Sequence, residues 1–154
     1  MSYVEKRIKQ ILAKKNIEFK EFQHEAVYTS EQAARVRGLK SAKSGIKSMI
    51  FKTETGKFLL VVNPGDKQVD TKKIARMENV KQLFIAKPEE VEGVTGVPIG
   101  CVAPFGLKTK LKTYLNEELL NNEYLYFNPG LHTETLEIRA EDLFRVLEDP
   151  IKFT

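Results

Sequence analysis

The sequence predicts a mixed α/β domain, because short strand-like segments alternate along the chain with segments of helical periodicity. A β-hairpin pattern and helical crossovers both occur, so we expect a sheet that is mixed in strand direction. The 154 residues are 42% hydrophobic and 30% charged, which permits a real core and excludes intrinsic disorder as the main state. No repeat, low-complexity run or linker interrupts the chain, so we expect one domain over residues 1–154.

The N-terminal part of the chain shows a helix, a strand and a second helix. Apolar residues at helical spacing predict a first helix from Tyr3 to about Asn16, and alternation then predicts a short strand over residues 17–24. A capping box from Thr29 to Gln32 opens a short helix, which Gly38 can end.

A β-hairpin follows in the middle of the chain. Extended segments at 46–53 and 57–63 flank a three-residue connection in which Gly56 can take a positive φ. Asp70 can cap a helix that runs to about Met77. Residues 82–86 then resemble a buried strand.

The last part of the chain contains a loop rich in glycine and proline. Pro88 opens a helix that Gly93 and Gly96 limit, and residues 95–106 predict a shaped loop flanking a short strand. The remaining predicted elements are strands at 111–115, 124–128 and 133–138 and an amphipathic helix with Leu143, Val146 and Leu147.

Charge and cysteine content narrow the functional classes. The 25 Lys and Arg residues exceed the 21 Asp and Glu residues by 4, a bias that permits contact with nucleic-acid phosphates. The lysines are either solvated surface residues or a basic rim around a cleft. They gather in three stretches, formed by Lys40, Lys43, Lys47 and Lys52, by Lys67, Lys72, Lys73 and Arg76, and by Lys108, Lys110 and Lys112.

Metal sites, cofactor sites and membrane segments are not expected. A single cysteine excludes an internal disulfide and a thiolate metal cluster, and no phosphate-binding or dinucleotide motif occurs. His24 and His132 have no ligand-type partner at helical spacing. The longest apolar run falls far short of a membrane span and the N-terminus offers no signal-peptide core, so we expect a cytoplasmic protein.

Two features stand out as candidates for chemistry. Strand alternation places Lys47 on one face with Met49 and Phe51, which makes it either a lysine on a buried face or an exposed lysine at the strand edge. The stretch from Gly100 to Pro104 either directs backbone N–H groups at a ligand oxygen or is only a tight connection. Both alternatives remain open at this point.

The order of these segments resembles the YbaK family of aminoacyl-tRNA deacylases, whose domain is also inserted in bacterial prolyl-tRNA synthetases. The combination of the lysine strand, the Gly-x-x-x-Pro loop and the Asn-x-Gly turn is specific, and the resemblance covers nearly the full length. The matching stretches are 22–24, 28–34, 45–52, 58–66, 100–107, 127–132 and 140–143.

The resemblance implies a fold with a barrel-like mixed sheet flanked by helices, and hydrolysis of the ester between a wrong amino acid and the terminal adenosine of a tRNA. Lys47 matches the family lysine and is expected to hold a phosphate or the carbonyl oxygen as a cation. Backbone N–H groups of Gly100, Cys101 and Val102 are expected to receive the oxyanion. The residues expected at the substrate are Tyr28, Thr29, Ser30, Pro104, Phe105, Asn128, Gly130 and His132.

Several functional details remain open in the sequence. Alanine is the first choice of amino acid, with cysteine, serine and threonine as alternatives, and the expected partners are the acceptor end of tRNA and a synthetase. A helix-capping role explains Thr29 equally well, and Cys101 can be a small hydrophobic residue packed in the loop. His132 can either line the pocket or order a water. The competing function is a non-catalytic tRNA-binding or synthetase-associated module of the same fold.

Overall fold

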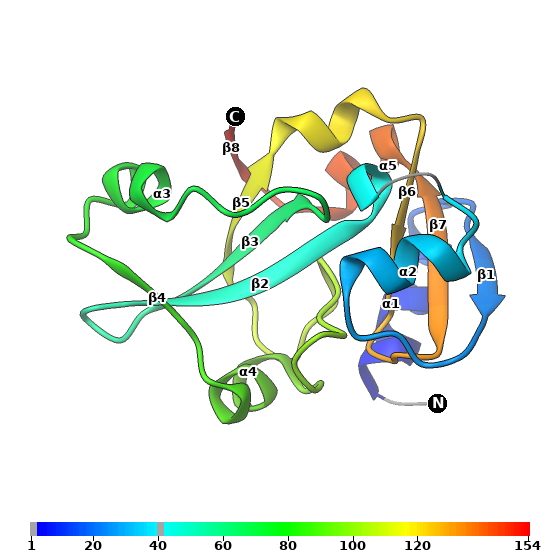
Figure 1. Ribbon diagram of the computed structural model, residues 1–154, viewed down its shortest axis with the longest axis horizontal. Helices are drawn as coiled ribbons and strands as arrows, with labels where there is room; N and C mark the ends of the chain where they lie inside the picture. Colours follow the sequence, from blue (N-terminus) through cyan, green and yellow to red (C-terminus); the bar gives the residue numbers. More distant parts are fainter. Residues whose placement is uncertain (1–2, 40–41) are drawn as a thin grey trace.

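The computed structural model describes residues 3–39 and 42–154 and confirms the mixed α/β fold (Figure 1). The described residues form two open sheets, one of five strands and one of three, instead of a single closed barrel. Figure 1 shows the larger sheet on one side of the molecule and the smaller sheet on the other, with α2 beside their junction.

The five-stranded sheet has the order β4-β2-β3-β5-β8. Its β4-β2-β3 part is antiparallel and its β3-β5-β8 part is parallel, which confirms the predicted mixture of directions. Strand β8 was not predicted, because its three residues follow the last helix at once and carry too short a pattern. The strands are β2 (Ile46–Thr53), β3 (Phe58–Pro64), β4 (Leu83–Ile85), β5 (Lys112–Asn116) and β8 (Ile151–Phe153).

The three-stranded sheet is antiparallel, with the order β1-β7-β6. Its strands are β1 (Lys20–Gln23), β6 (Tyr124–Phe127) and β7 (Glu134–Arg139). An isolated bridge between Gly45 and Tyr126 links it to the start of β2. The two sheets therefore meet where β2 begins.

Helices cover both sheets and close two apolar clusters. Ile8 and Leu12 of α1 are fully buried in the larger cluster, whereas Ile74 of α3 and Tyr114 of β5 are fully buried in the smaller one. The helices are α1 (Tyr3–Lys14), α2 (Ser30–Val36), α3 (Thr71–Glu78), α4 (Pro88–Thr95) and α5 (Ala140–Val146), with 3₁₀ turns η1 (Ala42–Ser44) and η2 (Glu117–Asn121).

The predicted turn and cap residues take the expected roles. The Thr29 hydroxyl accepts from Gln32 N–H and begins α2, and the Asp70 carboxylate accepts from Lys73 N–H and begins α3. Gly56 has φ 89° in the hairpin connection, and Gly96 has φ 83° at the C-terminus of α4.

Two predictions about local structure were wrong. Residues 82–86 form an edge strand, β4, in which Phe84 is 46% and Ile85 66% exposed, because β4 pairs only with β2. No strand lies in the loop 96–111, which packs instead against α1. A Cβ at Gly106, where φ is 73°, would come within 2.7 Å of Ile8 Cγ1, so this contact requires glycine.

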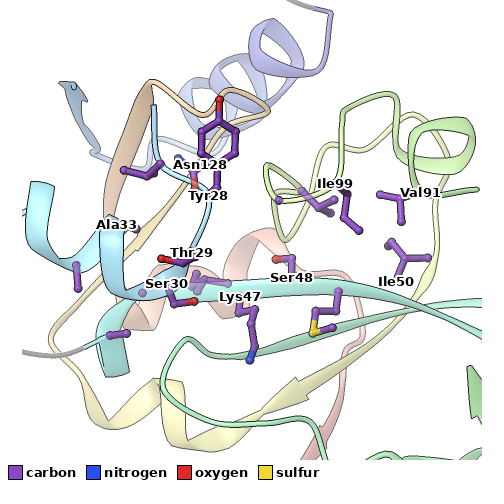
Figure 2. Close-up of a pocket in the computed structure, with 18 of the residues that line it drawn as sticks. Tyr28, Thr29, Ser30, Ala33, Lys47, Ser48, Ile50, Val91, Ile99 and Asn128 are labelled. Atoms are coloured by element: carbon purple, nitrogen blue, oxygen red, sulfur yellow. The ribbon is translucent and has the colours of Figure 1, made fainter. Parts of the chain in front are cut away.

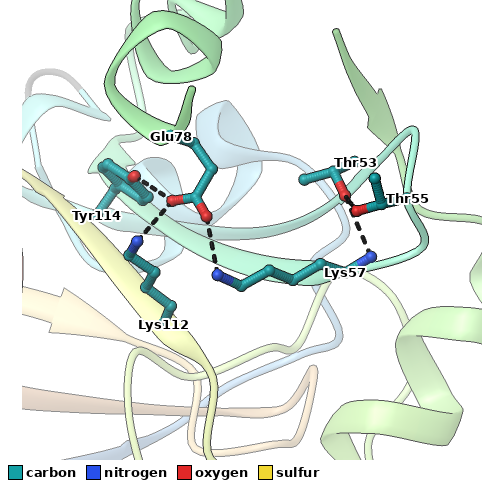
Figure 3. Close-up of polar contacts among 6 residues, drawn as sticks. All are labelled: Thr53, Thr55, Lys57, Glu78, Lys112 and Tyr114. Atoms are coloured by element: carbon teal, nitrogen blue, oxygen red, sulfur yellow. Dashed lines mark hydrogen bonds and ion pairs between the residues drawn. The ribbon is translucent and has the colours of Figure 1, made fainter. Parts of the chain in front are cut away.

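A buried carboxylate fastens the end of α3 to the larger sheet (Figure 3). Glu78 lies 2.8 Å from Lys57 Nζ and 2.8 Å from Lys112 Nζ, and it also accepts from the Tyr114 hydroxyl. Burial alone would raise the pKa of Glu78, but the hydrogen bonds from Lys112, Lys57 and Tyr114 lower it to about 2. The carboxylate is therefore ionised at neutral pH and joins α3 to β5 and to the hairpin connection just before β3.

Candidate functional site

A cavity of about 240 Å³ lies where α2, the first half of β2, α4 and the loop 96–111 approach one another (Figure 2). Strand alternation shapes it, because Ser48 and Ile50 lie on one side of β2 and Lys47 on the other. The predicted site residues that line this cavity are Tyr28, Thr29, Ser30, Lys47, Gly100, Val102 and Asn128.

Lys47 is half-buried on the same strand face as Met49 and Phe51, which is the predicted phase. Its Nζ donates to the backbone oxygen of Lys67 at 2.7 Å. Burial lowers its pKa, and the nearby Glu31 and Asp66 oppose this shift. The backbone position of Lys47 therefore borders the cavity, while its ammonium lies on the other side of β2 and is held by the carbonyl of Lys67.

Ser48 was not singled out from the sequence. Its Oγ is buried and has no hydrogen-bond partner among the described residues, although it lies in the wall of the cavity. A buried hydroxyl without a partner is costly unless a ligand or water completes it. The hydroxyl is therefore available to a bound group.

The Gly100–Val102 stretch forms part of the opposite wall. Gly100 has φ 91°, and a Cβ there would lie 3.1 Å from His132 Cε1, so both backbone shape and space favour glycine. Gly100 and Val102 line the cavity, whereas the Cys101 N–H donates to Pro98 O at 3.2 Å. Burial raises the pKa of the Cys101 thiol to about 11, so the sulfur stays protonated.

His132 lies directly behind Gly100 and is not in the cavity wall itself. Its Nδ1 is 2.9 Å from the oxygen of Val27, which assigns the proton to Nδ1 and leaves the Nε2 lone pair free. Its ring stacks on Tyr28, with centroids 4.5 Å apart, and Tyr28 is 67% exposed. The pair forms an aromatic platform at the edge of the site.

The remaining predicted residues divide between the cavity and its surroundings. Asn128 lines the cavity and its side-chain amide donates to Glu134 O, whereas Gly130 is buried with φ 93° and serves the turn before β7. Pro104 and Phe105 lie elsewhere, in the wall of a second cavity of about 530 Å³ beside α1. The structure therefore does not bring Pro104 and Phe105 together with Lys47.

Several cavity residues were not singled out from the sequence. Ile50, Val91 and Ile99 form its apolar end, and Arg37 at the end of α2 supplies a second cation. The hydrophobic residues belong to ordinary core patterns, and Arg37 lies outside every matched stretch. Only the topology identifies them.

Among the described residues, four lysines of the predicted basic stretches pair with carboxylates. Lys52 contacts Glu90 at 2.7 Å, and Lys67 contacts Glu118 at 2.6 Å. Lys110 and Lys112 pair with Glu148 and Glu78, and Lys40 lies outside the described residues. These pairs reduce the cationic charge that the three stretches present.

Within residues 3–39 and 42–154, no group of three or more His, Cys, Asp and Glu side chains is arranged to hold a metal ion. In the same residues, every helix is too short or too polar to cross a bilayer.

Comparisons with known proteins agree with the motifs. The sequence model of the aminoacyl-tRNA editing domain matches residues 24–146. The chain is 24% identical over 151 residues to the multifunctional Ser/Thr-tRNA deacylase ProXp-y of Escherichia coli, covering 96% of this chain and 90% of that protein. It is 28% identical over 131 residues to EbsC of Enterococcus faecalis, described as a candidate Cys-tRNA(Pro)/Cys-tRNA(Cys) deacylase, with 77% and 79% coverage.

A solved structure agrees as well. The fold matches a crystal structure described as a candidate trans-editing enzyme for prolyl tRNA synthetase, with a TM-score of 0.85, 26% identity and coverage of 99% and 96%. The resemblance inferred from the lysine strand and the two turn motifs is thereby confirmed. The chain belongs to the aminoacyl-tRNA editing domain family.

Proposed function

We propose that this protein hydrolyses the ester bond of a mischarged aminoacyl-tRNA in the cavity between α2, β2 and the loop 96–111. The observation that carries the proposal is the cavity wall, which Lys47, Ser48 with its unpartnered hydroxyl, and the side-chain-free Gly100 line together. We propose that residues 1–154 form one editing domain.

The aminoacyl ester supplies its own reactivity, so no protein nucleophile is required. A water oxygen adds to the carbonyl carbon, the carbonyl oxygen becomes an oxyanion, and the ester bond then breaks as the ribose oxygen leaves and takes a proton. N–H groups of Gly100 and Val102 are suited to the oxyanion, whereas the Cys101 N–H is already used by Pro98. Lys47 adds positive charge beside the cavity, from the other side of β2.

His132 is suited to ordering the attacking water. Its Nδ1 proton is bound to Val27, so its Nε2 can accept a proton or a hydrogen bond. Its ring packs against Gly100, where a Cβ would lie 3.1 Å from His132 Cε1. Gly100 is the residue closest to the proposed oxyanion. We assign His132 this positioning role and no covalent step.

The cavity favours a small amino acid. Ile50, Val91 and Ile99 suit the methyl group of alanine, and the larger side chains would collide with this wall. The unpartnered Ser48 hydroxyl instead favours serine or threonine, the amino acids in the name of the Escherichia coli relative. We therefore propose alanine and serine as the first substrates to compare.

The acceptor end of the tRNA would approach over Tyr28. An exposed tyrosine stacked on His132 offers a face on which a terminal base can stack, a contact that tolerates any base. Because many surface lysines are paired with carboxylates, we expect weak contact with the tRNA body and help from a synthetase partner.

The test is release of labelled amino acid from a panel of tRNAs charged with alanine, serine, threonine, cysteine and proline. We expect rapid release of one or more of the small amino acids and no release from correctly charged Pro-tRNA. A non-catalytic module would instead bind tRNA with a steep salt dependence and release nothing from the whole panel. That second result would contradict the proposed function.

A further inference from the structure

Arg37 is an arginine of the cavity wall that no part of the proposed reaction uses. Its Nε donates to the hydroxyl of the fully buried Thr135 at 3.0 Å. The same hydroxyl lies 2.7 Å from His24 Nε2, and His24 Nδ1 lies 2.7 Å from the oxygen of Glu25. One proton arrangement satisfies all three contacts: His24 donates to Glu25, Thr135 donates to His24, and Arg37 donates to Thr135.

This series of hydrogen bonds fixes the plane of the Arg37 guanidinium through its Nε. The two terminal nitrogens, Nη1 and Nη2, take no part in the series. Among the described residues, no carboxylate lies within ion-pair distance of Arg37, and its terminal nitrogens have no acceptor. Neither nitrogen is sealed from solvent. Burial lowers the pKa of Arg37 to about 10, so the group remains charged at neutral pH.

The guanidinium lies at one end of the cavity. A Cβ at Gly45 would be 3.1 Å from Arg37 Nη1, so the guanidinium rests close to the backbone where β2 begins. Ser48 follows three residues later, which is about 10 Å along a strand. In Figure 2 the apolar end, with Ile99 and Val91, lies on the opposite side from Ala33 of α2. The cavity thus has an apolar end, a polar middle and a cationic end.

The two cations of the cavity are not equivalent. The ammonium of Lys47 is already held by a backbone oxygen, whereas Arg37 presents free, planar and oriented N–H groups. A guanidinium held in this way matches two oxygens of a phosphate better than an ammonium does. An aminoacyl-tRNA has no free carboxylate near its ester, so its nearest anion is the phosphodiester on the 5′ side of the terminal ribose.

We propose that Arg37 and the start of β2 form an anion subsite for the phosphate on the 5′ side of the terminal adenosine. The subsite rests on the proposed function, and it assigns the phosphate to Arg37 instead of Lys47. By holding the phosphate on the 5′ side of the terminal ribose, the subsite places the ester on the other side of that ribose near Ser48 and Gly100.

The test compares two small esters of the amino acid that the wild-type protein releases fastest from tRNA. One is the 3′-O-aminoacyl ester of adenosine, and the other is the same ester carrying a 5′-phosphate. We expect the wild-type KM to be about ten- to a hundredfold lower for the phosphorylated ester, the range of a charged hydrogen bond, with similar kcat values. Equal KM values for the two esters would overturn the subsite.

Arg37→Gln should remove this difference by raising KM for the phosphorylated ester alone. Arg37→Lys keeps the positive charge but lacks the paired N–H groups of the guanidinium. This variant should therefore retain part of the KM difference between the two esters. Arg35→Gln is the matched control, because Arg35 is exposed on the same helix and does not line the cavity. An equal loss with both esters would mean that Arg37 only supports the fold and would overturn the subsite. If Arg37→Gln fails to fold, the wild-type and Arg37→Lys comparisons decide the question.

This design separates the two proposals. If the proposed function fails, the wild-type protein hydrolyses neither ester and none of the charged tRNAs. If only the subsite fails, both esters are hydrolysed without regard to the phosphate.

Discussion

At the scale of single residues, the direction of a side chain decides what it can do. Ser48 and Lys47 are neighbours on β2, yet alternation sends them to opposite sides of the strand. The Lys47 ammonium donates to a backbone carbonyl, whereas the Ser48 hydroxyl is buried in the cavity wall without a hydrogen-bond partner among the described residues. The two residues should therefore affect different properties of the reaction.

Ser48→Ala tests whether the free hydroxyl selects the amino acid. If serine is bound through Ser48, the variant should lose about five- to tenfold in kcat/KM for Ser-tRNA, since a paired hydroxyl contributes about 1–1.5 kcal/mol. Ala-tRNA should be hydrolysed as well as before or better, because the wall becomes more apolar. The measurement is the ratio of the two kcat/KM values, and equal losses on both tRNAs would exclude a role in selection.

Some of the candidate site residues could be predicted from the sequence and others could not. Lys47 was found because a lysine in an apolar strand is unusual, and Gly100 because its loop is rich in glycine and proline. Arg37 and Ser48 gave no such signal, since a surface helix and a strand each carry residues of these types as a matter of course. Pro104 and Phe105 were grouped with Gly100 by sequence proximity, but the loop turns and places them in the other cavity.

At the scale of elements, capping and turn residues made most helices and strands predictable. Thr29, Asp70 and Gly56 act through neighbours three or four residues away, so their roles can be read locally. The exposure of β4 could not be read in this way, because it depends on which strand lies at the sheet edge. The division of the strands between two sheets likewise depends on long-range pairing.

Helix α3 depends on a long-range contact of the same kind, the buried Glu78. Glu78→Gln should lower the free energy of unfolding by about 2 kcal/mol at pH 7, the value of hydrogen bonds to a charged group. The pKa of Glu78 is about 2 in the folded protein and about 4.3 in an unfolded chain, so this stabilisation is present above the unfolded pKa. It is lost as the pH falls through that interval toward 2.

Denaturant unfolding of the wild type and of Glu78→Gln between pH 7 and pH 2 checks this prediction. The free energies of unfolding of the two proteins should converge as the pH approaches 2. Glu148→Gln is the control, because its pair with Lys110 is exposed and should change nothing measurable. A constant difference between wild type and Glu78→Gln at every pH would show that the carboxylate charge is not the cause.

At the scale of the whole molecule, the site arises where the two sheets meet. The bridge between Gly45 and Tyr126 brings the start of β2 to the small sheet, and α2 covers this junction. Arg37 reaches β7 through Thr135, and Asn128 reaches it through Glu134. The cavity is therefore a product of the fold and not of one motif, which is why the sequence located its lysine but not its shape.

The global charge has a smaller role than the sequence predicts. The surplus of 4 positive charges remains, but in the part of the chain that the structure describes four lysines of the basic stretches are engaged in ion pairs. Affinity for the acceptor end should then depend on the cavity and its platform more than on a broad basic surface. The reaction should accordingly depend on the cavity and on Lys47 beside it.

The most direct measurement of that claim is single-turnover deacylation by wild type and Lys47→Ala, on the tRNA that the wild type hydrolyses fastest. Lys6→Ala is the matched control, because Lys6 is exposed on α1 and lines neither cavity described above. Thermal unfolding and circular dichroism establish that each variant is folded. We predict that Lys47→Ala is folded and loses deacylation, with a rate at least a hundredfold below wild type, while Lys6→Ala keeps it. A folded Lys47→Ala protein that deacylates at the wild-type rate would contradict the account.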